Sequence, residues 1–194
     1  MARKLAVIEF LTLDGVMQGF GSPDEDRDGG FEHGGWGDGY LDEQMGASAA
    51  EGMRTTSAYL FGRRTYGKMA AHWPNEPADN PMAAHLNATP KYVASRTLRQ
   101  LDWANSSVLE GELPVAVDEL KSAGEGTIAV LGSGVLVQQL IAYDLVDQYR
   151  LFLHPLILGS GKRLFSEISG PRRLRLLDCT PTGTGVVILS YAVA

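Results

Sequence analysis

The chain has 194 residues, 44% of them hydrophobic, and a formal net charge of −6 at pH 7. This length suits one domain with a full core, and the acidic balance, without a basic stripe, argues against nucleic acid as a partner. A single cysteine, Cys179, excludes an intramolecular disulfide framework, four scattered histidines show no zinc-ligand spacing, and no apolar run resembles a membrane span or a secretory signal. We therefore expect a cytoplasmic protein without metal or membrane contacts.

Strands and helices are expected to alternate along most of the chain. A strand is expected over 4–13, where β-forming residues alternate with others up to an Asp-Gly turn, and a helix over 42–55, where acidic residues at the start suit the helix dipole. Further strands are expected over 58–61, 91–94, 108–109, 127–131 and 146–153, and further helices over 65–71, 115–123 and 135–143. This alternation is typical of a mostly parallel sheet flanked by helices.

The end of the chain has a different pattern. Residues 174–180 and 186–193 flank a turn rich in Pro, Thr and Gly, which predicts an antiparallel hairpin at the sheet edge. Cys179 lies in this hairpin and is expected to be a small buried apolar residue.

A glycine-rich segment over 19–39 interrupts the alternation early in the chain. It carries eight glycines and the acidic run Asp24-Glu25-Asp26. A segment of this length inside a compact domain is either disordered or functional, and the interleaved Phe31, His33 and Trp36 favour an ordered loop that closes over a ligand.

Two strand-to-helix turns have the form of phosphate-binding sites. The Gly-Ser-Gly turn at 132–134 follows an apolar strand and opens a helix, which points free backbone N–H groups and the positive helix end at an anion. For a lone Gly-x-Gly, a plain strand-to-helix turn of an α/β domain is the more frequent explanation. The Gly-Arg-Arg-Thr turn at 62–65 has the same form and adds two guanidinium groups and a hydroxyl. Together the turns predict a site for an extended anion such as a dinucleotide.

The order of these motifs resembles the dihydrofolate reductase superfamily. The resemblance is carried by Leu-Asp-Gly-Val at 13–16, the turn at 62–66, residues 93–98 and the turn at 132–134. It is closer to the branch related to the reductase domain of bacterial riboflavin biosynthesis, whose C-terminal pattern looks like residues 145–151 and 155–165. The resemblance implies a single domain over 1–194 with a dihydrofolate-reductase-like α/β fold, in which helices flank a mostly parallel central sheet that ends in an antiparallel hairpin.

The resemblance also implies that NADPH binds in an extended pose across the strand ends. The residues it places against the cofactor are Gly62, Arg63, Arg64, Thr65, Ser95, Arg96, Thr97, Gly132, Ser133, Gly134, Val135 and Leu136. Physical chemistry supports one of these assignments separately, because a 2′-phosphate needs a hydroxyl and a cation, and Ser95 with Arg96 supplies both. A solvated surface arginine at a strand end is the alternative for Arg96.

In dihydrofolate reductases a loop tryptophan precedes an acidic residue that assists protonation of the pteridine. Trp36 and Asp42 have a similar layout, so the resemblance makes them the catalytic candidates. If Asp42 is buried beside the nicotinamide, its pKa is expected to rise, whereas a helix cap is the alternative role. Glu9 is unusual on an otherwise apolar strand, because a carboxylate there is costly unless it reaches a substrate pocket or meets an arginine.

The sequence therefore predicts an NADPH-dependent reductase of a small heterocycle, either dihydrofolate reductase-like or 5-amino-6-(5-phosphoribosylamino)uracil reductase-like. For a phosphoribosyl substrate, Lys162 and Arg163 are the candidate basic groups, with a solvated turn as the alternative. A homodimer is expected, because the hairpin and residues 151–158 are apolar and the riboflavin branch tends to form dimers. The competing hypothesis is a non-catalytic NADP(H)-binding protein, which Val137 favours because it stands where many folate reductases carry an active-site tyrosine.

Overall fold

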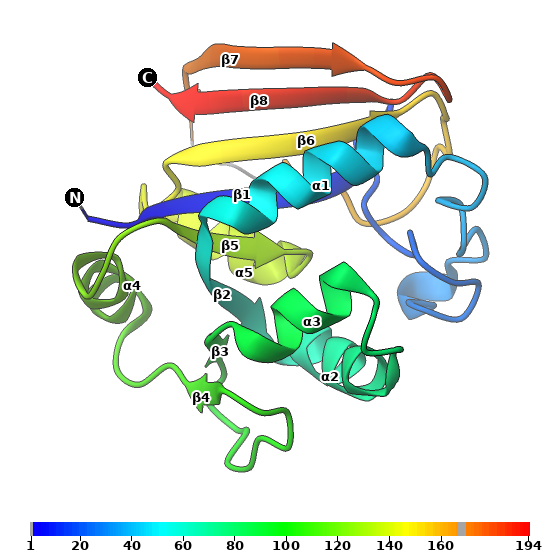
Figure 1. The fold of residues 1–194 in the computed structure, drawn as a ribbon. Helices are drawn as coiled ribbons and strands as arrows, with labels where there is room; N and C mark the ends of the chain where they lie inside the picture. Colours follow the sequence, from blue (N-terminus) through cyan, green and yellow to red (C-terminus); the bar gives the residue numbers. More distant parts are fainter. Residues whose placement is uncertain (1, 167–169) are drawn as a thin grey trace.

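A mixed sheet lies at the centre of the molecule, with helices on both of its faces (Figure 1). The computed structural model describes residues 2–166 and 170–194. The strands in them are β1 (Lys4–Thr12), β2 (Thr56–Gly62), β3 (Lys91–Ala94), β4 (Ser106–Val108), β5 (Thr127–Leu131), β6 (Gln148–His154), β7 (Leu174–Pro181) and β8 (Val187–Val193). The helices are α1 (Glu43–Thr55), α2 (Arg63–His72), α3 (Pro81–Ala88), α4 (Leu113–Ser122) and α5 (Gly134–Ala142), with short 3₁₀ helices η1 (Asp28–Gly30) and η2 (Trp73–Asn75).

The strand order is β4-β3-β2-β5-β1-β6-β8-β7. The pairs from β4 through β6 are all parallel, while β8 runs antiparallel to both β6 and β7. The predicted fold class, a mostly parallel sheet with an antiparallel C-terminal hairpin, is therefore confirmed. Within the described residues, no helix is long and apolar enough to cross a membrane.

The winding of the chain reverses between β5 and β1. Val7 and Leu11 pack in one hydrophobic cluster with Leu140 of α5, whereas Phe10 packs with Met45 of α1. Because successive side chains of a strand point to opposite faces, α1 and α5 cover opposite faces of the sheet. In open α/β sheets, ligands bind outside the carboxyl ends of the strands at such a switch point.

The expected elements are present, with ends shifted by at most two residues. Helix α3 is not among the elements predicted from the sequence. It is a short helix that begins at Pro81, and the Asn80 side chain caps it by accepting hydrogen bonds from the N–H groups of Met82 and Ala83. The expected burial of Cys179 is wrong, because β7 is the last strand of the sheet and this cysteine is exposed on it.

Candidate functional site

The two predicted glycine turns lie side by side at the carboxyl edge of the sheet. They follow β5 and β2, which are neighbours, and the Gly62 N–H donates a 3.0 Å hydrogen bond to the Ser133 hydroxyl oxygen. Gly132 has φ +60°, and a Cβ atom there would lie 3.4 Å from Thr65 Cγ2. Glycine thus permits both the left-handed backbone and the close approach of the two turns.

A third predicted turn continues the row at the next strand. Gly62 and Ala94 are partners in the register of β2 and β3, so Arg63 and Ser95 leave adjacent strands at the same edge. The Ser95 hydroxyl oxygen accepts the N–H of Leu98 at 3.0 Å, which leaves its own hydrogen free to donate. Arg63 and Arg96 are exposed and form no ion pair with the described residues. This edge of the sheet therefore carries backbone N–H groups, a hydroxyl group and two arginines that no described residue pairs with.

The acidic part of the glycine-rich loop lies against the first turn of α2. Arg64 forms an ion pair with Asp28, and the Lys68 ammonium donates to the Glu25 carbonyl oxygen. Lys162 binds the same loop, at 2.7 Å from Asp26 and 2.9 Å from Asp28. These hydrogen bonds, from Lys162 and then Arg64, hold the pKa of Asp28 below its usual range. These contacts tie the loop to α2 and to the segment after β6.

The two basic residues considered for a substrate phosphate already have partners. Lys162 is bound by the loop carboxylates, and Arg163 contacts the Asp14 carboxylate at 3.2 Å and the Asp14 carbonyl oxygen at 2.9 Å. Lys162 therefore ties the segment after β6 to the loop, and Arg163 ties it to the turn after β1.

Asp42 caps the start of α1. Its carboxylate accepts the N–H of Met45 at 2.9 Å and the N–H of Thr184, in the β7–β8 turn, at 3.3 Å. The hydrogen bond from Met45, followed by that from Thr184, lowers the pKa of Asp42. The expected rise in this pKa is therefore wrong, because backbone N–H donors stabilise the ionised form.

Trp36 holds the loop together. Its side chain is buried with Val16 and Phe31, and its indole N–H donates to the Gln18 carbonyl oxygen at 2.6 Å. Its ring also meets the edge of the His154 ring at a centroid distance of 5.1 Å. Trp36 thus joins the loop to the carboxyl end of β6.

His154 is a buried residue that the sequence analysis did not single out. It has no exposed surface, and its Nδ1 lies 2.9 Å from the Phe152 carbonyl oxygen and 3.2 Å from that of Leu11. This nitrogen must carry a proton to donate to those carbonyls. Nε2 has no partner among the described residues, and burial lowers the pKa of the ring. The rings around it are Phe10, Phe20, Trp36 and Tyr40.

Glu9 is the buried carboxyl group at the switch point. Its side chain is 4% exposed and accepts a hydrogen bond from the Gly132 backbone, and burial raises its pKa to about 8. A carboxylate on this strand is expected to meet either a substrate pocket or an arginine. In the structure Glu9 instead lies beside the glycine turn at 132–134.

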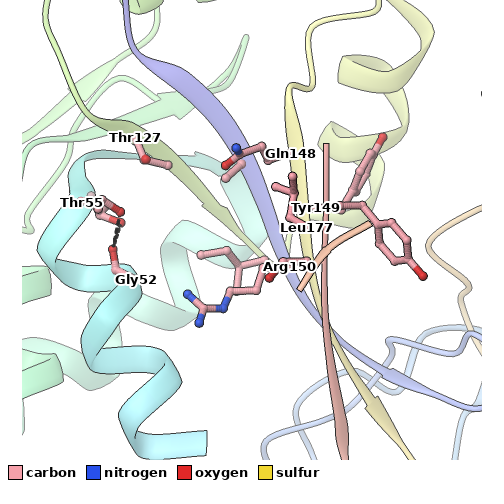
Figure 2. A pocket seen from close by; sticks show the side chains of 12 residues that line it. Gly52, Thr55, Thr127, Gln148, Tyr149, Arg150 and Leu177 are labelled. Atoms are coloured by element: carbon pink, nitrogen blue, oxygen red, sulfur yellow. Dashed lines mark hydrogen bonds between the residues drawn. The ribbon is translucent and has the colours of Figure 1, made fainter. Parts of the chain in front are cut away.

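A separate pocket lies between the last turn of α1 and the amino-terminal half of the sheet (Figure 2). Thr127 and Gln148, which begin β5 and β6, are among its lining residues, so it lies away from the glycine turns. The Arg150 side chain lies 3.8 Å from Glu51, near the carboxyl end of α1. A cation at this position complements the helix dipole, which gives Arg150 a structural role.

A mostly parallel sheet, an antiparallel C-terminal hairpin and a row of turns at the carboxyl edge define a dihydrofolate-reductase-like α/β protein. The chain belongs to the family described as the RibD C-terminal domain, which matches residues 3–188. This confirms the resemblance drawn from the motifs, and membership of the family supports a reductase-type activity.

Two solved structures share the fold. A putative riboflavin biosynthesis protein from Shewanella sp. PV-4 is 19% identical with a TM-score of 0.72, over 100% of this chain and 99% of that one. Dihydrofolate reductase from Enterococcus faecalis, complexed with NADP(H), is 14% identical with a TM-score of 0.60, over 100% of this chain and 99% of that one. Uncharacterized protein YyaP of Bacillus subtilis is 28% identical over 158 residues, which cover 78% of this chain and 80% of that protein.

Proposed function

We propose that this chain is an NADPH-dependent reductase that transfers hydride to a small planar heterocycle. The observation that carries the proposal is the row of three turns at one sheet edge, where Arg63 and Arg96 are exposed without ion-pair partners among the described residues. Along this edge, the backbone N–H groups of the glycine turns suit a pyrophosphate, and the guanidinium groups suit a 2′-phosphate further along the same ligand. The NADP(H) complex of the Enterococcus enzyme, which has the same fold, supports a nicotinamide cofactor.

The chain's own residues would bind and orient the cofactor, while the bound nicotinamide would supply the hydride. In this proposal the turns at 132–136 and 62–65 hold the pyrophosphate side, and residues 95–97 hold the adenosine side. The loop over 19–39 would exclude water from the reacting groups.

The substrate side of the proposal rests on the rings around His154. Rings from β1, the loop and β6 pack around the buried His154 at the carboxyl edge, and its Nε2 has no partner among the described residues. In this proposal a heterocycle with a polar ring atom displaces part of the ring cluster and binds this nitrogen. Lys162 and Arg163 are already bound by carboxylates. We therefore favour an unphosphorylated pteridine or pyrimidine over a phosphoribosyl substrate.

Asp42 and Trp36 have supporting roles in this proposal. Asp42 fixes the start of α1 against the β7–β8 turn, and Trp36 anchors the loop beside His154. A carboxyl group with a lowered pKa is ionised at neutral pH, so the proton that accompanies hydride transfer would come from another group or from water.

Substrate-dependent oxidation of NADPH tests the proposal. A panel of dihydropteridines, free pyrimidines and their phosphoribosyl derivatives should give turnover with an unphosphorylated compound. NADPH binding without oxidation by any of them would support the alternative function, a non-catalytic NADP(H)-binding protein. Val137, which stands at the position of the expected tyrosine, is fully buried in the core.

A further inference from the structure

Glu9 lies where β5 separates from β1. Ile8 is the register partner of Leu131, the last residue of β5, while β1 continues to Thr12. Glu9 therefore stands beside Gly132, at the point where the chain turns away from β1. Its side chain lies on the α5 face of the sheet, as do those of Val7 and Leu11. This position lies at the carboxyl end of β5, one of the two strands that flank the switch point.

One oxygen of this carboxyl group has no partner. Glu9 is 4% exposed, a carboxyl oxygen accepts a hydrogen bond from the Gly132 backbone, and Oε2 is buried without a hydrogen bond among the described residues. A buried polar atom without a hydrogen bond is rare in folded proteins, and one explanation is that a bound ligand supplies the missing partner.

The surroundings of Glu9 favour its neutral form. Residues 127–142, which include β5 and α5, carry no ionisable side chain. From β6, Tyr149 and Leu151 lie in the same cluster as Val7, and from the loop the Glu25 charge further raises the pKa of Glu9. With burial as the main cause, that pKa stands at about 8, so the carboxyl group carries a proton at neutral pH.

We propose that Glu9 binds the dinucleotide directly, by donating a hydrogen bond from its protonated Oε2 to an oxygen of the phosphate and ribose groups at the glycine turn. The inference rests on the proposed function. A protonated carboxyl group accepts with one oxygen and donates with the other, which matches the Gly132 N–H on one side and a ligand acceptor on the other. An ionised Glu9 has no hydrogen to donate and repels phosphate. Cofactor affinity must therefore fall as pH rises through the pKa of Glu9.

The test compares dissociation constants for NADPH between pH 7 and 9 in the wild type and in Glu9→Gln. The range begins at pH 7 because the 2′-phosphate of NADPH is a phosphate monoester, whose second ionisation lies near pH 6 and would add its own pH dependence below pH 7. With a pKa of about 8, the wild type should lose affinity about 10-fold across this range. Glutamine accepts and donates in the same geometry at every pH, so Glu9→Gln should keep the affinity of the wild type at pH 7. Glu119→Gln changes an exposed side chain on α4, and its NADPH affinity should depend on pH as that of the wild type does.

Proton counting provides a readout that needs no variant. Calorimetry in two buffers of different ionisation enthalpy at pH 8.5 should show uptake of roughly 0.8 proton per NADPH bound by the wild type and none by Glu9→Gln. Tight binding that is independent of pH, or an equal pH dependence in Glu9→Gln, overturns this inference alone. Failure of the folded wild type to bind NADPH at any pH overturns the proposed function and this inference with it.

Discussion

The Gly62 N–H and the Ser133 hydroxyl oxygen, 71 residues apart in the chain, are joined by a hydrogen bond of 3.0 Å. This bond aligns the turn after β2 with the turn after β5, so the two candidate phosphate sites form one surface. Ser133 adopts φ +65°, a left-handed conformation that few side chains adopt readily, which places its hydroxyl toward Gly62.

Ser133→Ala is expected to loosen this alignment. The Gly62 N–H would lose its partner in a partly buried position, which should lower the free energy of unfolding by about 1 kcal/mol. NADPH affinity should fall as well, because the two turns would no longer be held in register. Denaturant unfolding and NADPH titration check both effects. Ser122→Ala, which removes an exposed hydroxyl at the end of α4, is the matched control. Unchanged affinity in Ser133→Ala would show that the alignment does not depend on this bond.

Arg96→Ala is expected to erase most of a preference for NADPH over NADH. Arg96 follows Ser95 just after β3, is exposed, and has no ion-pair partner among the described residues. Loss of a charge-assisted contact to the 2′-phosphate should cost about 1 to 3 kcal/mol of NADPH binding and leave NADH binding unchanged. Arg99→Ala, three residues further along and also exposed, should retain the preference. Equal affinity of the wild type for the two cofactors would reject the assignment.

Asp42→Asn is expected to preserve both fold and turnover. Asparagine caps a helix as well as aspartate does, because its amide oxygen can accept the N–H of Met45. The 3.3 Å hydrogen bond from Thr184 is made to the other carboxylate oxygen, so it is the only one of the two that Asp42→Asn removes. Asp42→Ala should lower the melting temperature because it removes the cap. Steady-state kinetics with an active substrate provides the check, since loss of a general acid reduces turnover by roughly two to four orders of magnitude. A reduction of that size in Asp42→Asn, with unchanged NADPH affinity, would restore Asp42 as the proton donor.

Local patterns predicted most of this structure. The alternation of strand and helix, the glycine turns at 62 and 132 and the C-terminal hairpin each depend on residues close in the chain, so they can be read from the sequence. The eight-residue helix α3 was missed because it is short and contributes only Ala83 and Leu86 to the core, a weak periodic signal.

Features that depend on strand order could not be predicted. The surroundings of His154 combine rings from β1, the loop and β6, which meet only because β1 and β6 are neighbours. The exposure of Cys179 depends on β7 being the last strand of the sheet. Asp42 gains a second hydrogen bond from Thr184 because the β7–β8 turn lies beside the start of α1, and this contact contributes to the lowered pKa.

The sheet edge formed by the hairpin is expected to mediate a homodimer. Leu174, Leu176 and Leu177 of β7 are 37%, 51% and 44% exposed, an unusual apolar surface for an edge strand. Sedimentation at micromolar concentration should show a dimer, and Leu176→Lys should shift it to monomer. Val115→Lys, at an exposed apolar position on α4, should leave the dimer intact. A wild type that sediments only as monomer would contradict this expectation.

The protonation of His154 is expected to limit stability in acid. Burial lowers the pKa of the folded-state ring below the unfolded value near 6.5, so the folded protein holds this histidine neutral while the unfolded chain binds a proton. The stability contribution is therefore complete above about pH 6.5 and decreases as pH falls below it, by at most about 1.4 kcal/mol per pH unit. Urea unfolding at pH 7 and pH 5 should show a smaller decrease in His154→Gln than in the wild type, by on the order of 1 kcal/mol. His33→Gln removes an exposed histidine of the loop and should follow the wild type. Equal acid sensitivity in the wild type and His154→Gln would assign the decrease to other groups.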